Sequence, residues 1–329
     1  MTDVHTKQLV ASEIGGLWTT YLSDSMLECV YSYFTTKVED PDIEKIIQRT
    51  LEIAIKHKTE KMIIFQKEGH VEPLGFTNAD VHVDAPKLYT DEFLLHYTKQ
   101  ALQGAISSYN ATIPHTFRKD IRDHFLTCID DALKLYDEMT DLMMNKGLAI
   151  TPPSIPYMNE LDMVEKKRFF DGWFGEERPL TAIEITELYA NISSNDVGIA
   201  LLKGFSQCAK NEEVRNYFND GKELGKEQIK RLSKYLQKND LPIPLSTRTH
   251  VLDSTDSPFS DKLMMSQIAI LSASSIGYYG LALSMCTRSD LIKEFSKLLS
   301  EAGVYAGKGS SLLVKHGWLE KPPHALHIQ

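Results

Sequence analysis

The strongest constraint on the fold is an internal repeat that spans nearly the whole chain of 329 residues. The same landmarks return at an offset of 171 residues in the first half of each copy and 170 in the second, as expected of tandem domains. They include Glu13 with Glu184, Leu17 with Leu188, Phe34 with Phe205, Asp91 with Asp261, Tyr109 with Tyr279, Arg118 with Arg288, and Gly147 with Gly317. The chain is therefore a duplication of one unit of about 145 residues, a normal domain size.

Apolar residues recur at helical spacing in four long segments of each copy. The segments are 13–38, 41–68, 91–113 and 117–146, then 184–209, 212–239, 261–286 and 288–316. This pattern predicts an all-α protein of two tandem four-helix bundles. The predicted domains are residues 1–150 and 181–329, joined by a Pro- and aromatic-rich linker at 151–180.

Connection lengths predict the order of the helices. The first two helices are joined by a few residues around Asp40 or Asn211, so they are antiparallel neighbours. About twenty residues separate the second helix from the third, enough to run back along a whole helix. One such long crossover between helices 2 and 3 is the ferritin-like arrangement, and a simple up-down-up-down bundle is the alternative.

Ferritin-like bundles that perform redox chemistry carry inward Glu residues and Glu-x-x-His motifs. The segment 54–57 keeps His57 but has Ala54 at the carboxylate position, and 225–228 has neither ligand. The third helices contain no Asp or Glu between Phe93 and Pro114, or between Leu263 and Arg288. The sequence therefore predicts that neither bundle holds a carboxylate-bridged di-metal centre.

A few polar residues still fall on the inward faces. In the first copy these are Asp24, Glu28 and His57, and Asp24 and His57 are predicted to lie at one height. The equivalent positions in the second copy, Asn195 and Gln228, predict a buried amide pair. One interpretation is that each pair is a self-satisfied hydrogen bond. The other is that Asp24, Glu28 and His57 bind a single divalent metal or a small polar ligand.

Two further histidines, His96 and His124, are expected to be partly exposed surface residues. The linker carries the aromatic residues Phe169, Phe170, Trp173 and Phe174. We expect this cluster to pack at the interface between the bundles, with a membrane or partner contact as the alternative.

Composition narrows the function. A net charge of −9 without a Lys/Arg-rich run argues against a nucleic-acid partner. The N-terminal residues lack the apolar core of a signal peptide, and no transmembrane segment is expected. Four widely spaced cysteines suit buried thiols better than disulfides or a zinc site. These features predict a soluble cytoplasmic protein, and we expect it to form a homo-oligomer or to bind a protein partner.

Several motifs carry a family resemblance over nearly the whole chain. They are the segments 12–18 (SEIGGLW), 177–186 (ERPLTAIEIT), 204–207 (GFSQ), 260–265 (SDKLMM) and 317–323 (GWLEKPP). On these motifs the chain resembles an uncharacterised bacterial family of tandem ferritin-like proteins from spore-forming bacilli. The resemblance implies the fold but no activity and no site residues.

These observations favour a non-catalytic structural or interaction protein on a ferritin-like scaffold that needs no cofactor. A link to sporulation or stress follows from the hosts of the resembling family. The alternative, from a different class, is a metal- or ligand-binding bundle centred on Asp24, Glu28 and His57.

Overall fold

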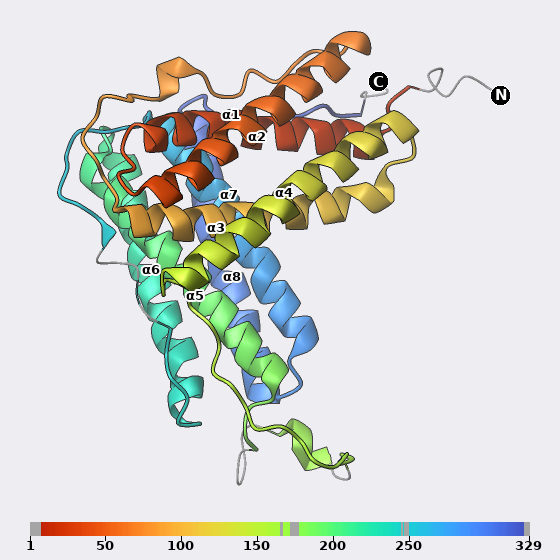
Figure 1. The fold of residues 1–329 in the computed structure, drawn as a ribbon, viewed down its shortest axis with the longest axis vertical. Coiled ribbons are helices and arrows are strands. Elements are labelled where there is room, and N and C mark those ends of the chain that lie inside the picture. Colours follow the sequence, from red (N-terminus) through yellow and green to blue (C-terminus); the bar gives the residue numbers. More distant parts are fainter. Residues whose placement is uncertain (1–7, 165–166, 172–177, 245, 247–249, 326–329) are drawn as a thin grey trace. The chain divides into compact units, whose positions relative to one another are not determined.

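The computed structural model describes residues 8–164, 167–171, 178–244, 246 and 250–325. Across these residues the chain is all-helical, with eight α-helices and no named strand (Figure 1). The helices are α1 Ala11–Thr35, α2 Pro41–Lys67, α3 Asp91–Thr112, α4 Lys119–Asn145, α5 Ala182–Cys208, α6 Glu212–Gln237, α7 Asp261–Met285 and α8 Ser289–Lys315. The predicted all-α, two-repeat architecture is confirmed.

Capping residues and glycines set where the helices begin and end. Asp40 accepts hydrogen bonds from the backbone N–H groups of Asp42 and Ile43 at the start of α2, and Pro41 occupies the first helical position. Asn211 caps α6 in the same way. Gly147 and Gly317, both at φ 68°, adopt the left-handed conformation that ends α4 and α8. Equivalent residues therefore set equivalent helix ends in both repeats.

The chain folds into two compact units, and these do not coincide with the two sequence repeats. Unit 1 contains the described residues of Met1–Ala149, Leu252–Met264 and Val314–Gln329. Unit 2 contains those of Ile150–Val251 and Met265–Leu313. A short segment of the second repeat thus belongs to unit 1, and each unit is described separately below.

Contacts at the helix ends define the helix order in unit 1. The Asp91 carboxylate, at the start of α3, accepts hydrogen bonds from the N–H groups of Glu39 and Asp40 at the start of α2. α2 and α3 therefore begin at the same end, and the connection 68–90 runs back along α2. Glu13, in the first turn of α1, likewise accepts a hydrogen bond from Arg118 N–H at the start of α4. The up-down-up-down alternative would place α2 and α3 antiparallel, so these contacts argue against it.

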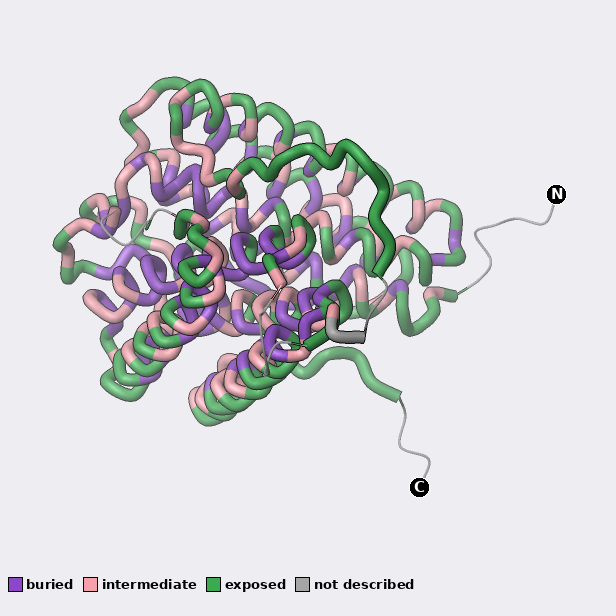
Figure 2. Tube along the Cα trace, turned by 90° about the horizontal axis from the view of Figure 1, so that it is seen from below, coloured by how far each residue is buried: buried purple, intermediate pink, exposed green. Residues whose placement is uncertain are grey.

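Each helix turns one face inward, as the alternation of buried and exposed residues in Figure 2 shows. The core of unit 1 includes Leu17, Trp18, Phe65, Phe125 and Cys128, and that of unit 2 includes Leu188, Leu232, Tyr279, Phe295 and Leu298. All of these residues lie in the segments where the sequence shows apolar residues at helical spacing.

Among the residues that the structure describes, one helix, α7, is long and apolar enough by length and composition to cross a membrane. Only 17% of its most apolar window is buried. Tyr279 and Ala282 of this helix nevertheless lie in the core of unit 2, and the Tyr279 hydroxyl bonds to α5 and α6. Specific polar contacts of this kind are those of a bundle helix.

Candidate functional site in the first repeat

The most unusual feature of unit 1 is an ion pair buried in the middle of its helices. Lys61 of α2 has no exposed surface, and its Nζ lies 2.5 Å from Oδ2 of Asp24 on α1. Burial raises the pKa of Asp24, while the Lys61 ammonium acts in the opposite direction. An ammonium with no access to water requires such a paired charge. The pair therefore fixes how α1 and α2 meet.

The sequence predicts that Asp24 pairs with His57, but in the structure the partner of Asp24 is Lys61. His57 lies close enough to act on Asp24 electrostatically, but the hydrogen bond to Asp24 comes from Lys61, one turn further along α2. The long lysine side chain reaches back along the helix, in the direction that helical side chains normally take.

The predicted metal ligands do not come together as a ligand group. Asp24 is paired with Lys61, Glu28 forms an ion pair with Lys58, and His57 contacts a different carboxylate. Among the described residues, no group of three or more His, Cys, Asp or Glu side chains is arranged to hold a metal ion. Each candidate ligand is instead part of a separate helix-to-helix contact.

His57 links the interior to the surface. Its Nε2 lies 3.1 Å from Oδ2 of Asp131 on α4, and Lys56 contacts the same carboxylate oxygen at 2.7 Å. On the other side of the ring, the Tyr109 hydroxyl lies 3.5 Å from Nδ1. Burial lowers the pKa of His57, so the ring is neutral near pH 7. A neutral ring can donate from Nε2 to Asp131 and accept at Nδ1 from Tyr109.

A Cys-His-Glu chain lies beside this network. Sγ of Cys128 is 3.5 Å from Nε2 of His124, whose Nδ1 is 3.0 Å from Oε2 of Glu60. Such an order can activate a thiol for nucleophilic attack, but only if the thiolate forms and is accessible. Cys128 has no exposed surface, and burial raises its pKa to about 12. The thiol therefore stays protonated and acts as a core residue.

The side chain of His124 is only 7% exposed, and the residue as a whole is of intermediate burial, in agreement with the prediction that it is partly exposed. Burial, reinforced by nearby cations, lowers the pKa of His124 to about 3. Its contact with Glu60 is therefore a hydrogen bond from a neutral ring. For His96 the prediction of partial exposure is wrong, because this residue is buried.

The second repeat has a neutral cluster at the equivalent level. Asn195 of α5 donates to the Tyr279 hydroxyl at 2.8 Å, and that hydroxyl donates to Gln228 of α6 at 2.9 Å. The two amides predicted to pair are thus bridged by a tyrosine. Tyr279 is the repeat equivalent of Tyr109, so the same tyrosine position reaches the inward polar residue of the second helix in both units.

At a neighbouring position, both repeats make a contact between the second and fourth helices, but with different residues. In repeat 1, Glu60 of α2 faces His124 of α4. At the equivalent positions in repeat 2, Arg231 of α6 contacts Glu294 of α8 at 2.8 Å, and it also contacts Glu301. The acidic residue lies on the second helix in repeat 1 and on the fourth helix in repeat 2, but the two helices are in contact at this position in both repeats. This conserved pairing with exchanged partners indicates a structural role.

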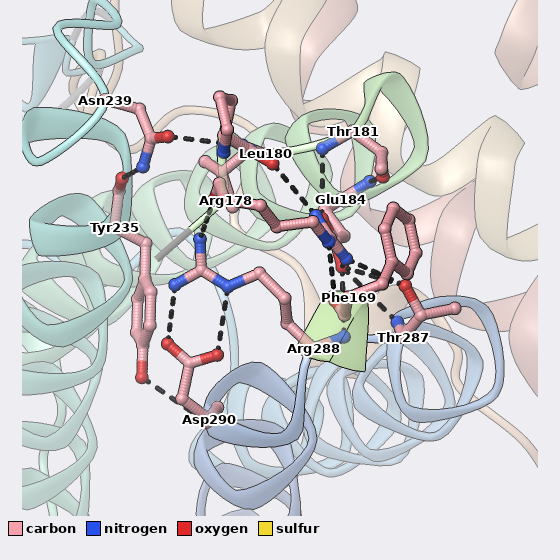
Figure 3. A network of polar contacts seen from close by, with 11 residues as sticks. Phe169, Arg178, Leu180, Thr181, Glu184, Tyr235, Asn239, Thr287, Arg288 and Asp290 are labelled. Carbon is pink, nitrogen blue, oxygen red and sulfur yellow. Dashed lines mark hydrogen bonds and ion pairs between the residues drawn. The ribbon is translucent and has the colours of Figure 1, made fainter. Parts of the chain in front are cut away.

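A second polar network, at one end of unit 2, is shown in Figure 3. The Glu184 carboxylate accepts hydrogen bonds from the backbone N–H groups of Thr181, Thr287 and Arg288. The guanidinium of Arg178 contacts both of its oxygens, at 2.7 and 2.8 Å. One carboxylate thus binds N–H groups at the start of two helices, which otherwise lack partners inside a helix.

Unit 1 contains the matching network. Glu13 accepts hydrogen bonds from the N–H groups of Val10, Phe117 and Arg118. The side chain of Arg118 bonds Asp120, as that of Arg288 bonds Asp290. Because both repeats have it, this network stabilises the fold, and the polar interior of repeat 1 remains the feature that distinguishes the two.

Part of the linker cluster lies within the described residues. The Phe169 ring lies 4.2 Å from the Arg178 guanidinium, and Phe170 contacts Phe169 edge to face. Phe170 is half exposed, whereas Trp173 and Phe174 lie outside the described residues. The packing of this cluster at an interface between the bundles stays a prediction.

The buried histidines predict an acid-sensitive unit 1. The folded state holds the pKa of His57 and His124 below the ordinary value of 6.5, so below that pH the unfolded chain binds protons that the folded chain does not. Stability present above pH 6.5 should therefore decline as the pH falls toward the folded-state pKa values. Unfolding by denaturant, followed through Trp18, should show this decline.

His57→Gln, which introduces the residue of repeat 2, is the matched variant for this prediction. It should make the decline in stability between pH 7 and 5 shallower. An unchanged pH dependence in this variant would show that His57 is not linked to folding.

Together the fold and these interior clusters define a class: an all-helical protein of two tandem repeats whose inward polar groups bind one another. The chain belongs to the family described as Protein of unknown function (DUF3231), whose model matches residues 2–161 and 168–328. A comparison with curated proteins finds no match.

Among solved structures, the chain is similar to one described as a putative spore coat protein from Bacillus halodurans C-125. The sequences are 17% identical, and the match covers 47% of this chain and 100% of the other at a TM-score of 0.43. A likeness at this level carries no argument about function.

Proposed function

We propose that the protein is a non-catalytic structural or interaction protein built on two ferritin-like four-helix bundles. One observation carries the proposal. At the level where such bundles place metal ligands, the polar side chains of repeat 1 are engaged with one another, as in the Asp24–Lys61 pair, and those of repeat 2 form the neutral Asn195–Tyr279–Gln228 cluster. A lysine ammonium in this position repels a metal cation.

The helix order supports the ferritin-like assignment. In unit 1, α2 and α3 begin at the same end because Asp91 bonds the start of α2, and α1 and α4 begin together at the other end through Glu13. This order and a long connection between the second and third helices are those of ferritin-like bundles.

An exposed face of α7 supports an interaction role. Ile270, Leu281 and Met285 are exposed on this helix, and the space beside Gly277 is open. No charged residue lies between Leu263 and Arg288. The equivalent positions in repeat 1 are Gln100 and Ala111 of α3 and His115, which follows α3, so repeat 1 lacks this set of three large apolar residues. Uncharged exposed faces of this kind are typical of protein contacts.

The test of the non-catalytic role is oxygen and peroxide consumption by the purified chain with added ferrous iron. We expect the same rate as in a buffer control with equal iron. A protein-dependent rate that falls in Asp24→Asn would contradict the proposal. Glu223→Gln, on the surface of α6, is the matched control for handling and purity.

The resemblance to proteins of spore-forming bacilli extends the proposal to a cytoplasmic protein of sporulating or stressed cells. Quantifying the protein in growing cells, sporulating cells and purified spores of the native host tests this extension. Equal amounts throughout growth and sporulation, with none in spores, would contradict a link to sporulation.

A further inference from the structure

The connections between the second and third helices of the two repeats are paired with each other inside unit 1. Residues 80–88 come from repeat 1 and residues 252–260 from repeat 2, and both segments belong to this unit. Val81 forms an antiparallel bridge with Phe259. Backbone hydrogen bonds run from Ser260 N–H to Asp80 O at 2.9 Å, from His82 N–H to Pro258 O at 2.8 Å, and from Leu252 N–H to Leu88 O at 2.9 Å.

The register of this pairing is self-complementary. Under the repeat offset of 170, His82 corresponds to Leu252 and Leu88 corresponds to Pro258. The bond from His82 to Pro258 and the bond from Leu252 to Leu88 are therefore the same bond, made once in each direction. The two segments are equivalent under this offset and run antiparallel, so the pairing is an isologous contact, in which the same patch is used by both partners.

Side chains anchor the paired segments. Phe259 is 1% exposed and lies against the Tyr33 ring, with the centroids 5.3 Å apart. The Ser260 hydroxyl donates to the Asp80 carboxylate at 2.7 Å, and Lys262 donates to the Gly75 carbonyl at 2.9 Å. Near the C-terminus, Glu320 accepts hydrogen bonds from the N–H groups of Leu74 and Gly75. The segment of repeat 2 is therefore built into unit 1 by main-chain, polar and apolar contacts.

The residue types at equivalent positions agree with an isologous contact between the two segments. Val81 corresponds to Val251, and Phe259 corresponds to Tyr89. A valine and an aromatic residue thus stand at the same two positions in each repeat. Tyr89, Val251 and Phe259 are buried, and Val81 is partly exposed. Both copies have kept these residue types although the neighbouring sequence has diverged.

We infer that residues 80–90 and the paired segment 252–260 form an isologous recognition surface whose partner is a second copy of the same repeat. In this chain both copies lie on one polypeptide, so the contact is satisfied internally. A chain with one such repeat would use the same surface to bind a second copy of itself. The inference rests on the paired segments and is independent of the proposed function.

The full-length protein provides the test. Tyr157 and Leu161 are 98% and 88% exposed, so a protease recognition sequence inserted between them can be cut in the folded protein. A denaturing gel confirms the cut, and size-exclusion chromatography with light scattering then measures the native mass. We expect the two fragments to elute together at the mass of the uncut chain. Fragments that separate in native buffer would overturn the inference.

Val81→Asp with Phe259→Asp is the disrupting variant, because it places two carboxylates on the paired segments. Its cut fragments should separate, and fragments that stay together would contradict a role for this pairing. Hydrogen exchange on the uncut wild-type chain avoids any folding defect of the variant. The amides of His82 and Leu252 should be protected, and exchange at the rate of an open loop would also overturn the inference.

Discussion

Lys61→Leu alone is expected to lower the free energy of unfolding of unit 1 by about 3–5 kcal/mol, because it leaves the Asp24 carboxylate buried without its counter-ion. Leucine is the residue at the equivalent position of repeat 2, Leu232, so the new side chain suits a helix of this family. A loss of this size is a large part of the stability of a single domain. Urea unfolding followed through Trp18, which lies in the core of unit 1, measures it.

The matched control is the double variant Asp24→Asn with Lys61→Leu. It introduces both residues of repeat 2, Asn195 and Leu232, and leaves no charge buried. Its stability should return to within about 1 kcal/mol of wild type or exceed it, because replacing a whole buried pair is often neutral or stabilising. If the single and double variants lost the same stability, the buried ion pair would not explain the effect.

Glu184→Gln is expected to destabilise unit 2 by about 2–4 kcal/mol, since one carboxylate binds Arg178 and three backbone N–H groups. Burial opposes the ionisation of Glu184, but the Arg178 guanidinium and the backbone N–H groups outweigh it and lower its pKa to about 2. This stability should be present above pH 4.5 and be lost as the pH falls toward 2.

Thermal unfolding by calorimetry at pH 7 and at pH 3.5 checks this prediction. The wild-type chain should lose more stability than Glu184→Gln over this interval. Glu223→Gln, at an exposed ion pair on α6, should change stability by less than about 1 kcal/mol. If Glu184→Gln matched this control, the carboxylate would not hold the helix ends together.

The helices were predictable because they depend on local periodicity. The eight helices agree with the predicted segments to within a few residues. Glu13 with Glu184 and Arg118 with Arg288 stand out as repeat landmarks, and the structure shows that each Glu bonds the backbone of its Arg. A residue kept at the same position in both copies thus indicated a shared structural contact.

The partners of the inward polar residues were less predictable. Helical phase places Asp24, His57 and Lys61 on inward faces, but height along the axis alone does not say which side chain reaches which. Lys61 is the partner of Asp24 because its long side chain spans a helical turn. Tyr109 and Tyr279 reach across the interior through their hydroxyls, and Asp131 approaches from the edge of its inward face beside Ala132.

The sequence repeat did not predict that residues 252–264 pack in unit 1. Equivalence in sequence shows which segments share an origin, whereas packing decides which segments share a core. The apolar Phe259 finds its contact on Tyr33, a position occupied by Gly204 in repeat 2. The Tyr33–Gly204 difference between the repeats was the feature of the sequence that indicated this contact.

The central claim is that the inward polar side chains of both repeats contact one another and do not bind a metal ion. Elemental analysis of the full-length protein, purified without chelators from cells grown with added iron, zinc and manganese, tests it most directly. The claim predicts sub-stoichiometric metal, with the same low content in wild type and in Asp24→Asn. One or more equivalents of a divalent metal per chain in wild type, lost in Asp24→Asn, would contradict it.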